Sequence, residues 1–432
     1  MTELRIAGGQ VLRPDGAVER ADVLVDRAAG EVLAIGPDVG GGDETLDAEG
    51  GLVAPGLVNA HTHVAMTLLR GYADDKPLEA WLREDVWPVE AELEPADVRA
   101  GTELGVLEMI RSGTTAFADM YFHMDQVADV VAESGVRGRL GYGMIMAGKA
   151  DESAKEAELE RGVGFATEHD GRAGGRVRTA VMPHSLYTVG ADYLEAARDE
   201  ARANGLPLHF HAAETATEVA DVREQHGDTV IEAADALDLL GPETFVAHGV
   251  HVTDDEIDRL AATGTGVVHC PASNMKLASG MAPVQAMLDA GVTVGLGTDG
   301  AASNNDLDLF DEVRDAAMLG KLAAEDAEAV DAASAVGLAT GGSAEAIGLD
   351  AGRLEPGAAA DLIVLDLEAA HLTPAHDLGS HLAYAVSGSD VRHTVCDGEV
   401  LMRDREVLTL DESAVIERAG DRAAALVERA EA

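Results

Sequence analysis

Two histidines, His61 and His63, stand two residues apart at the end of an apolar run that begins at Leu57. Side chains in a β-strand alternate between its faces, so both imidazoles would point to the same side. Two neutral imidazoles that converge at a strand end can chelate a divalent metal, and zinc is the commonest partner of such nitrogen ligands. Two histidines at this spacing also occur as ordinary surface or cross-strand residues, so a metal site needs further ligands.

Further polar residues stand where they could join this pair. Three other short apolar runs contain His211 with Glu214, His248, and Asp299. Each has a plain explanation by itself, because a strand histidine can be a core residue and the Gly-Thr-Asp-Gly around Asp299 can be a turn closed by an Asx hydrogen bond. Their common position at strand ends favours a single site built from several strands.

The elements that must position these residues are eight candidate strands separated by helical stretches. Short runs rich in Val, Ala, Gly and Thr alternate with stretches rich in Ala, Glu, Asp and Arg. We expect strands at residues 57–63, 114–120, 137–145, 178–185, 207–214, 244–251, 264–274 and 292–300, with helices that include 97–113, 191–205 and 281–291. Eight strand-helix units in about 250 residues are what a (β/α)8 TIM barrel requires. An open doubly wound sheet is the alternative, but no glycine-rich phosphate loop follows the first strand.

The two ends of the chain differ in residue pattern from its middle. Residues 1–55 and 357–409 contain alternating or valine-rich segments broken by Gly and Asp at turn positions, and the tail to residue 432 has helical periodicity. We therefore expect an α/β fold in which residues 56–356 form a metal-dependent (β/α)8 barrel. Residues 1–55 and 357–432 would form a small composite β domain with a C-terminal helix.

The charge balance is strongly acidic. The 432 residues include 31 Lys and Arg against 79 Asp and Glu, a formal net charge of −48, and five of the cations are lysines. Such a surface disfavours nucleic acid as a partner. Many acids, few lysines and 3% aromatic residues are typical of a protein adapted to molar salt, where screening shortens to about 3 Å. A merely acidic protein is the alternative, and it would keep its structure at low salt.

Targeting signals and thiol chemistry are not indicated. No stretch reaches the roughly eighteen consecutive apolar residues of a spanning helix, and the first residues lack the basic and apolar regions of a signal peptide. Cys270 and Cys396 form no CxxC pair, so neither a disulfide framework nor a thiolate zinc site is expected. These features favour a cytoplasmic protein without a membrane partner. The sequence leaves the oligomeric state open, a homo-oligomer included.

The chain resembles the amidohydrolase superfamily, and within it the cytosine and adenosine deaminase-like branch of 5-methylthioadenosine/S-adenosylhomocysteine deaminases. The similarity runs nearly end to end, through GLVNAHTHVAMTLLRGYADD, PHSLYT, LHFHAAET, VAHGVH, HCPASNMKLASGMAPV and LGTDGAASNNDLDLFDE. Together with the composition, it suggests a member from a halophile. The resemblance implies a zinc-dependent aminohydrolase that converts adenine nucleosides, with water, to the inosine analogues and ammonia.

The resemblance implies that His61, His63, His211 and Asp299 bind one zinc ion or a similar divalent metal. Three imidazoles and one carboxylate suit zinc by ligand type. Binuclear members of the superfamily carry a carboxylated lysine at the end of strand four. Here that strand reads RTAVMPHS and has no lysine, so one metal per subunit is expected.

Catalytic roles follow from the same resemblance. Zinc lowers the pKa of water toward about 7, and His248 and Asp299 are expected to hold that water and take its proton. Glu214 is expected to contact the substrate as general acid, protonating the ring nitrogen beside the carbon under attack. The plain alternative for Glu214 is a solvated glutamate in the first turn of a helix. His209, one pleat below His211, is expected to be a barrel-interior residue.

Two substrate contacts depend on resemblance more than on local pattern. Glu90, in DVWPVEAEL, matches the acid that binds the ribose hydroxyls, and His184, in PHS, matches a histidine that contacts the purine or ribose. A helix-surface acid is the alternative for Glu90. Trp81 and Trp87 flank the same segment and are equally compatible with pocket walls and with packing residues.

One position departs from the family pattern. Members that accept S-adenosylhomocysteine can use an arginine near the end of strand three, where this chain has Tyr142. Lys149 or Lys155 could replace it as a point charge, without the bidentate fork of arginine. Methylthioadenosine, adenosine or 5′-deoxyadenosine would then be preferred over the charged homocysteine adduct.

Other functions are compatible with the same fold. Guanine deamination, or triazine or ring-amide hydrolysis, would use the same metal with a different pocket. A non-catalytic scaffold is a third possibility, but it would be expected to have lost ligands, whereas the four ligand positions and the acid at position 214 are all intact.

Overall fold

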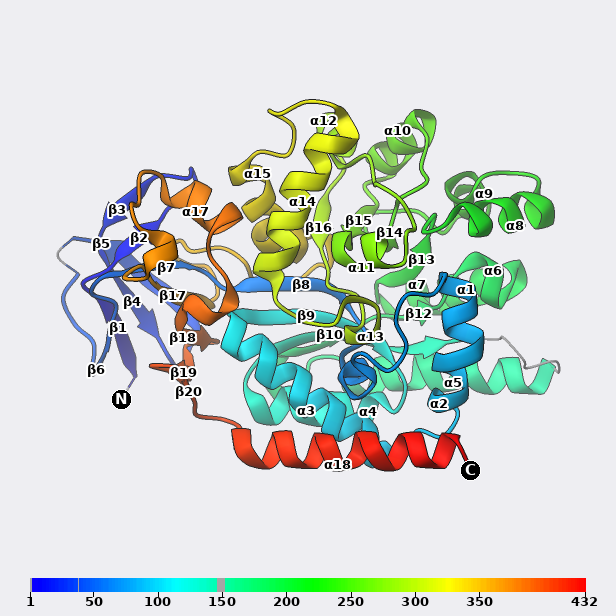
Figure 1. Cartoon of the computed structure of the whole chain (residues 1–432), viewed down its shortest axis with the longest axis horizontal. Coiled ribbons are helices and arrows are strands. Elements are labelled where there is room, and N and C mark those ends of the chain that lie inside the picture. Colours follow the sequence, from blue (N-terminus) through cyan, green and yellow to red (C-terminus); the bar gives the residue numbers. More distant parts are fainter. Residues whose placement is uncertain (1, 38, 146–151) are drawn as a thin grey trace.

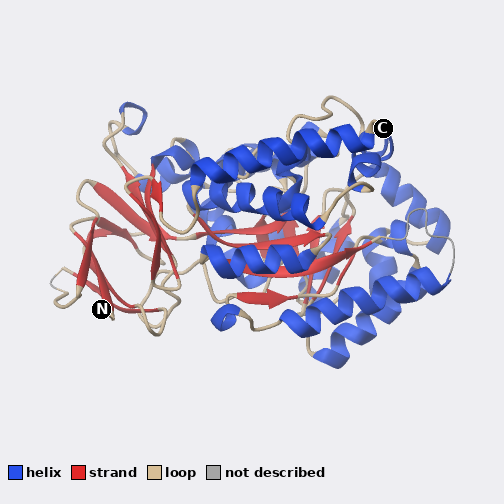
Figure 2. Ribbon diagram, turned by 90° about the horizontal axis from the view of Figure 1, so that it is seen from below, coloured by secondary structure: helices blue, strands red, loops and turns tan. Residues whose placement is uncertain are grey.

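The computed structural model describes residues 2–37, 39–145 and 152–432, without the side chains of residues 152–155. A barrel of parallel strands stands at its centre, with helices around it (Figures 1 and 2). The barrel strands are β8 (Leu57–Thr62), β9 (Thr114–Tyr121), β10 (Arg137–Met144), β11 (Val177–Thr179), β12 (Met182–Pro183), β13 (Leu208–Ala212), β14 (Thr244–His248), β15 (Gly266–His269) and β16 (Val294–Leu296).

Neighbouring strands pair in chain order until the barrel closes. One parallel sheet runs β11-β10-β9-β8, with β12 also paired to β10, and a second runs β13-β14-β15-β16. An isolated bridge between Thr62 and Asp299 joins β8 to the segment after β16, and a bridge between Ser185 and His211 joins the fourth strand to β13. The predicted (β/α)8 barrel is confirmed, with β11 and β12 together forming its fourth strand.

Two predicted strands need correction. The strand expected at 178–185 is divided, because Ala180 N bonds to Leu140 O on one side while Val181 N bonds to Pro207 O on the other. The strand expected at 264–274 ends at His269, and α11 (Pro271–Lys276) follows. Proline is favoured in the first turn of a helix because the N–H it lacks would be unpaired there.

Helices connect the strands on the outside of the barrel. The first long one, α3 (Pro95–Ser112), begins with a capping box between Glu94 and Asp97 and ends at Gly113, whose φ of 90° favours glycine. The other long connecting helices are α4 (Met124–Ser134), α5 (Glu152–His169), α7 (Ala191–Asn204), α8 (Ala216–His226), α9 (Val230–Ala236), α10 (Asp254–Thr263), α12 (Val284–Ala290) and α14 (Leu309–Ala324). Shorter helical segments are η1 (Val64–Leu69), α1 (Leu78–Trp81), η2 (Leu82–Val86), α2 (Trp87–Glu90), η3 (Ala173–Gly175), α6 (Leu186–Val189), α13 (Ala301–Asn304), α15 (Ala332–Gly337), η4 (Leu338–Gly342) and α16 (Ser343–Ala346).

Segments from both ends of the chain share a β structure beside the barrel, at the left of Figure 1. The strands are β1 (Glu3–Ala7), β2 (Gln10–Leu12), β3 (Val18–Arg20), β4 (Asp22–Asp26), β5 (Glu31–Gly36), β6 (Glu44–Asp47), β7 (Gly51–Pro55), β17 (Leu362–Asp366), β18 (Val391–Cys396), β19 (Glu399–Arg403) and β20 (Glu406–Val407). One sheet runs β5-β4-β1-β6 and the other β20-β19-β18-β17-β7-β2-β3. Val364 of β17 lies opposite Val53 of β7, so the two ends of the chain meet within one sheet. The boundaries at residues 55/56 and 356/357 remain predictions.

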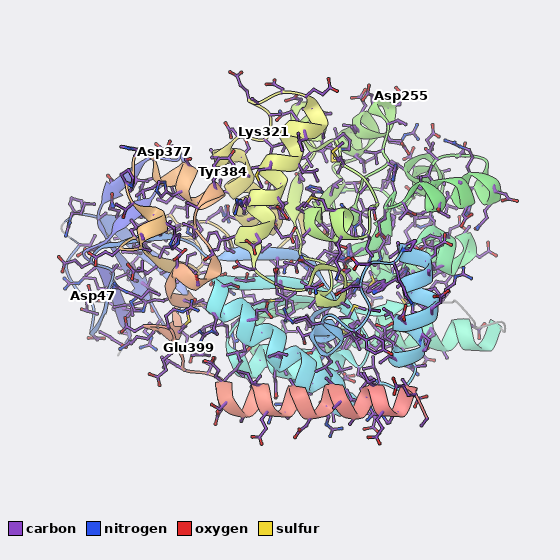
Figure 3. All side chains as sticks on the ribbon, viewed as in Figure 1. Asp47, Asp255, Lys321, Asp377, Tyr384 and Glu399 are labelled. Atoms are coloured by element: carbon purple, nitrogen blue, oxygen red, sulfur yellow. The ribbon has the colours of Figure 1, made fainter. Side chains whose placement is uncertain are left out.

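The C-terminal helix α18 (Glu412–Ala430) lies against α3 along the lower edge of Figure 1. Ion pairs of Arg418 with Glu103 and of Arg429 with Asp97 fasten it there. A further contact between late and middle segments joins Lys321 of α14 to Tyr384 of α17 (Leu378–Tyr384), with the ammonium 5.9 Å from the ring centroid (Figure 3). Two short 3-10 segments, η5 (Ala370–Leu372) and η6 (Gly388–Asp390), flank α17. Over the described residues, we find no helix with the length and apolarity needed to cross a membrane.

Candidate active site

The histidines that end β8 meet a third histidine from the opposite side of the barrel. His61 lies within β8 and His63 follows it, with ring centroids 4.9 Å apart. His211, near the end of β13, places its Nε2 3.4 Å from Nε2 of His63. One ring nitrogen from each of the three histidines lies within 4.8 Å of the others, an arrangement that could hold a metal ion.

Asp299, in the segment after β16, completes the group. Its Oδ1 lies 3.3 Å from His63 Nε2 and 3.5 Å from His61 Nε2. The other oxygen, Oδ2, accepts hydrogen bonds from the hydroxyls of Ser273 at 2.7 Å and Ser303 at 2.9 Å. The backbone of Asp299 has a φ of 60°, which is unfavourable for a residue other than glycine. Local strain and two hydroxyl donors therefore direct Oδ1 toward the histidines.

The three histidines present Nε2 because their Nδ1 atoms are already bonded. His63 Nδ1 lies 2.6 Å from Met120 O, and His211 Nδ1 lies 2.8 Å from His184 O. A carbonyl oxygen only accepts, so both Nδ1 atoms carry hydrogen, and in a neutral ring bonded in this way the lone pair is on Nε2. Burial lowers the pKa of His61 to about 4, which keeps that ring neutral as well.

One buried atom shows that the donor set fits a metal. His61 is 1% exposed, and its Nε2 has no hydrogen-bond partner among the described residues. A buried polar nitrogen without a partner is unfavourable unless something else fills its lone-pair direction. Three imidazole nitrogens and one carboxylate oxygen suit zinc by ligand type. The ligands suggested by the sequence analysis are therefore together in space; their role as ligands remains a proposal.

Glu214 and His248 face each other beside this group. His248 Nε2 lies 3.6 Å from Glu214 Oε2, and His248 Nδ1 is 3.0 Å from Asn274 Oδ1. Burial, followed by the charge of Asp299, raises the pKa of Glu214 to about 8. Glu214 is thus a buried carboxyl that still holds its proton at neutral pH, in place of the solvated glutamate that was the alternative.

Glu90 reaches the site from α2. Tyr121, the last residue of β9, donates a hydrogen bond from its hydroxyl to Glu90 Oε1 at 2.7 Å. Burial raises the pKa of Glu90 to about 7, while the hydrogen bond from Tyr121 lowers it. Glu90 is therefore not a helix-surface acid. Among the described residues its second oxygen has no hydrogen-bond donor, so it can accept from a ligand.

His184 follows β12 and stacks on His211, with ring centroids 4.5 Å apart and planes 30° apart. Its Nδ1 lies 3.1 Å from Thr188 Oγ1 and 3.3 Å from Ser185 Oγ. Burial lowers the pKa of His184 to about 3, so the ring is neutral. His184 can therefore offer an uncharged imidazole to a ligand that lies beside His211.

These residues line one cavity at the carboxyl ends of the barrel strands. The predicted residues on its wall are His63, Glu90, His184, His211, Glu214, His248 and Asp299. Trp81 and Trp87 also line it, and Trp81 is fixed by a 3.0 Å hydrogen bond from Nε1 to Ala73 O.

Several residues of the site were missed in the sequence analysis. Ser273 and Ser303 lie within the motifs quoted above, and Tyr121 directly follows the strand expected at 114–120, but their types alone carry no signal. The partner of Tyr142 was also missed: Arg161 of α5, which does not line the cavity, has its Nη1 2.9 Å from the Tyr142 hydroxyl and its guanidinium 5.5 Å from that ring. Lys149 lies outside the described residues, as does the side chain of Lys155.

Comparison with known proteins agrees with this geometry. The chain is 64% identical over 431 residues to a 5-methylthioadenosine/S-adenosylhomocysteine deaminase of the halophilic archaeon Haloarcula marismortui, covering 100% of both chains. It is 44% identical to a 5′-deoxyadenosine deaminase of Methanosarcina mazei, covering 99% of both.

Solved structures agree on the fold. An adenosine deaminase from Xanthomonas campestris with bound zinc matches with a TM-score of 0.93 and 37% identity over 98% of both chains. An atrazine chlorohydrolase from Arthrobacter aurescens complexed with zinc matches with a TM-score of 0.90 over 97% of this chain and 100% of the other; at 24% identity it bears on the fold alone. The profile of the Amidohydrolase family matches residues 52–401, and the chain belongs to that family.

Proposed function

We propose that the protein is a zinc-dependent deaminase of adenine nucleosides, with 5′-methylthioadenosine and S-adenosylhomocysteine as the substrate class. The observation that carries the proposal is Glu214, a carboxyl group with a pKa raised to about 8, which lies beside His248 in the cavity that His63, His211 and Asp299 also line. Full-length relatives that are named for this reaction support the substrate class.

In this proposal His61, His63, His211 and Asp299 hold the metal. When bound, zinc supplies a Lewis acid that lowers the pKa of an attacking water toward about 7. The protein's own groups do the rest of the proton handling. Glu214 donates its proton to the purine ring nitrogen beside the amino-bearing carbon, which makes that carbon electrophilic. His248 and Asp299 orient the water and accept the proton it loses as its oxygen bonds to the carbon. The amino group then takes the proton held by His248 and Asp299 and leaves as ammonia. As its C–N bond breaks, the added oxygen gives its remaining hydrogen to Glu214 and becomes the carbonyl oxygen of the product, which restores the acid.

Glu90 and His184 are proposed to hold the nucleoside. Tyr121 fixes Oε1 of Glu90, so Oε2 is the atom that would accept hydrogen bonds from ribose hydroxyls. The ring of His184, stacked on His211, lies where it would contact the purine or ribose.

The walls of the cavity bear on the 5′ substituent. Phe122, Ile145 and Leu78 are among its apolar lining residues, and none of the described lining residues is a lysine or arginine. Apolar walls favour a methylthio group or a 5′-deoxy carbon over the charged amino-acid end of the homocysteine adduct. We therefore propose that 5′-methylthioadenosine and 5′-deoxyadenosine are better substrates than S-adenosylhomocysteine.

A substrate panel tests the proposal. Ammonia release would be measured in molar KCl with 5′-methylthioadenosine, S-adenosylhomocysteine, adenosine, 5′-deoxyadenosine and guanine. We expect release from the adenine nucleosides and the highest kcat/KM with uncharged 5′ groups. Release from guanine alone would point to the alternative deaminase, and a preference for S-adenosylhomocysteine would contradict the assignment of the apolar wall.

The cellular setting is inferred from the state of the cysteines and from the net charge. Both cysteines, Cys270 and Cys396, are free and buried, as expected in a reducing cytoplasm. The net charge of −48 argues against nucleic acid as a partner. A cytoplasmic enzyme that acts on a small nucleoside, as a monomer or homo-oligomer, is the resulting proposal.

A further inference from the structure

The three metal-site histidines differ in what holds their Nδ1 atoms. His63 and His211 are bonded to backbone carbonyl oxygens. His61 is instead bonded to a side chain: its Nδ1 lies 2.9 Å from Nε2 of His209. His209 is therefore the one partner among these three that a substitution can remove without touching a proposed ligand.

The other nitrogen of His209 sets the direction of this hydrogen bond. His209 Nδ1 lies 2.9 Å from Phe245 O, and a carbonyl oxygen only accepts, so Nδ1 of His209 must carry hydrogen. His209 is 1% exposed, and burial favours the neutral ring, whose Nε2 is then an acceptor. His61 Nδ1 must donate to it, which leaves the lone pair of His61 on Nε2.

The surroundings of His209 hold its ring in one orientation. It stacks on the ring of Phe245, with centroids 4.1 Å apart and planes 13° apart. His209 and Phe245 are also paired in the register of β13 and β14. A half-turn of the ring would keep this stacking but put Cδ2 and Cε1 in place of Nδ1 and Nε2, which breaks the hydrogen bonds to Phe245 O and to His61. The two hydrogen bonds and the stacked plane therefore favour one orientation of His209.

We propose that His209 is a positioning residue of the metal site, which accepts the Nδ1 hydrogen of His61 and thereby keeps the His61 Nε2 lone pair directed at the metal. This extends the barrel-interior role expected for His209 from the sequence. The inference rests on the proposed function only in that His61 binds a metal. Partners of this kind typically contribute about 10- to 100-fold to metal affinity.

Two substitutions separate hydrogen bonding from packing. His209→Phe keeps a flat ring that can stack on Phe245 but offers no acceptor to His61. His209→Gln places an amide oxygen at the reach of the imidazole Nε2, so it can still accept from His61. His393→Phe is the control, because His393 is also 1% exposed but lies on β18, away from the metal group.

The measurement is zinc affinity of the full-length, metal-free proteins in molar KCl, by competition with a chromophoric chelator and without any nucleoside. We expect His209→Phe to raise the zinc Kd about 10- to 100-fold, and His209→Gln and His393→Phe to stay within about threefold of wild type. Wild-type affinity in folded His209→Phe would overturn the inference, and so would equal losses in the Gln and Phe variants. Failure of the wild-type protein to bind zinc would instead contradict the proposed function.

A measurement on the wild-type protein covers the case in which His209→Phe does not fold. Histidine labelled with ¹⁵N reports which ring nitrogen carries hydrogen, and the signals of His61 are identified by their loss in His61→Gln. The inference requires a protonated Nδ1 and a bare Nε2 on His61 in the metal-free protein. A His61 ring protonated at Nε2 would overturn it.

Discussion

The two ends of the barrel differ in how completely their buried charged and polar groups are paired. At the amino end of β10, Arg137 donates from Nε to Asp361 Oδ2 at 2.7 Å and from Nη2 to Asp397 Oδ1 at 2.8 Å. The backbone N–H of Asp397 also donates to Asp361 Oδ1 at 2.7 Å. We call these three residues the Arg137 cluster. Each carboxylate there has a cation and a hydrogen bond, so the cluster is closed on itself.

At the carboxyl ends of the strands, the buried polar groups are not all paired in this way. His61 Nε2 is buried without a hydrogen-bond partner among the described residues, and Glu214 has a pKa raised to about 8 by burial. Asp299 and His248 have φ angles of 60° and 76°, each of which costs of order 1–3 kcal/mol. Strain and unfilled lone pairs persist where a ligand supplies the missing interactions. The contrast teaches that buried charge alone does not mark the site, whereas incomplete pairing does.

The largest expected effect comes from removing the carboxylic acid of Glu214 at the carboxyl ends of the strands. Glu214→Gln should lower kcat by about 10²- to 10⁴-fold, because the amide cannot donate a proton as a carboxylic acid does. Zinc content, measured by mass spectrometry, should stay at wild-type level, since Glu214 is not a proposed ligand. Near-normal kcat in this variant would refute the role of Glu214.

Lower salt should destabilise the whole fold, because the acidic groups on its surface then repel one another more strongly. The chain carries a net charge of −48, and the Debye length grows from about 3 Å at 1 M salt to about 10 Å at 0.1 M. On dialysis from molar KCl to low salt, we expect the melting temperature to fall and activity then to be lost. Circular dichroism measures the melting temperature at each salt concentration. An unchanged melting temperature would mean a merely acidic protein without salt adaptation.

Disrupting the Arg137 cluster should lower the stability of the fold without changing catalysis. Arg137→Met leaves Asp361, whose side chain is 0% exposed, as an uncompensated charge, so we expect a loss of about 3–5 kcal/mol in the free energy of unfolding. The kcat of the folded fraction should be close to wild type. The control is Arg202→Met, which removes an ion pair with side chains 51% and 72% exposed and should leave the free energy of unfolding nearly unchanged. Equal losses in both variants would remove the distinction between the two kinds of pair.

The alkaline limb of the pH profile should come from Glu214. Its pKa is raised to about 8, so the proton-donating form predominates below that pH and is lost above it. We expect kcat/KM to fall about tenfold per pH unit on the alkaline side, beginning near pH 8. Residual activity of Glu214→Gln should lack this limb, and a limb that persists unchanged there would assign the titration to another group.

The smallest expected effect concerns substrate positioning. Tyr121→Phe removes the hydrogen bond to Glu90 Oε1, worth about 1 kcal/mol, so KM should rise about fivefold with little change in kcat. Because that hydrogen bond lowers the pKa of Glu90 from a value already raised by burial, its loss should also shift the pH dependence of KM upward. Tyr193→Phe is the control, because the Tyr193 hydroxyl is buried without a partner among the described residues. Equal effects of the two substitutions would exclude a specific role for Tyr121.

Strand-end residues could be predicted from the sequence because two simple periodicities act together. The two-residue repeat of a strand places His61 and His63 side by side, and a barrel of parallel strands gathers all carboxyl ends at one mouth. His211 and Asp299 are therefore neighbours of this pair although they lie far away in the chain.

Contacts between elements could not be predicted in the same way. The bond between His61 and His209 depends on how β8 and β13 face each other across the barrel interior, and no local pattern encodes that approach. The hydroxyls of Ser273 and Ser303 reach Asp299 from two short helices, one of which was expected to be strand. These side chains are ordinary by type and become part of the site only through the tertiary structure.

Metal-dependent turnover of 5′-methylthioadenosine tests the central claim most directly. The full-length protein would be stripped with a chelator in molar KCl and reloaded with increasing zinc, while ammonia and the nucleoside product are measured together. The account predicts no turnover without metal, full activity at one zinc per chain, and one ammonia for each methylthioinosine formed. Undiminished turnover by the stripped protein, or no ammonia from any adenine nucleoside after reloading, would contradict it.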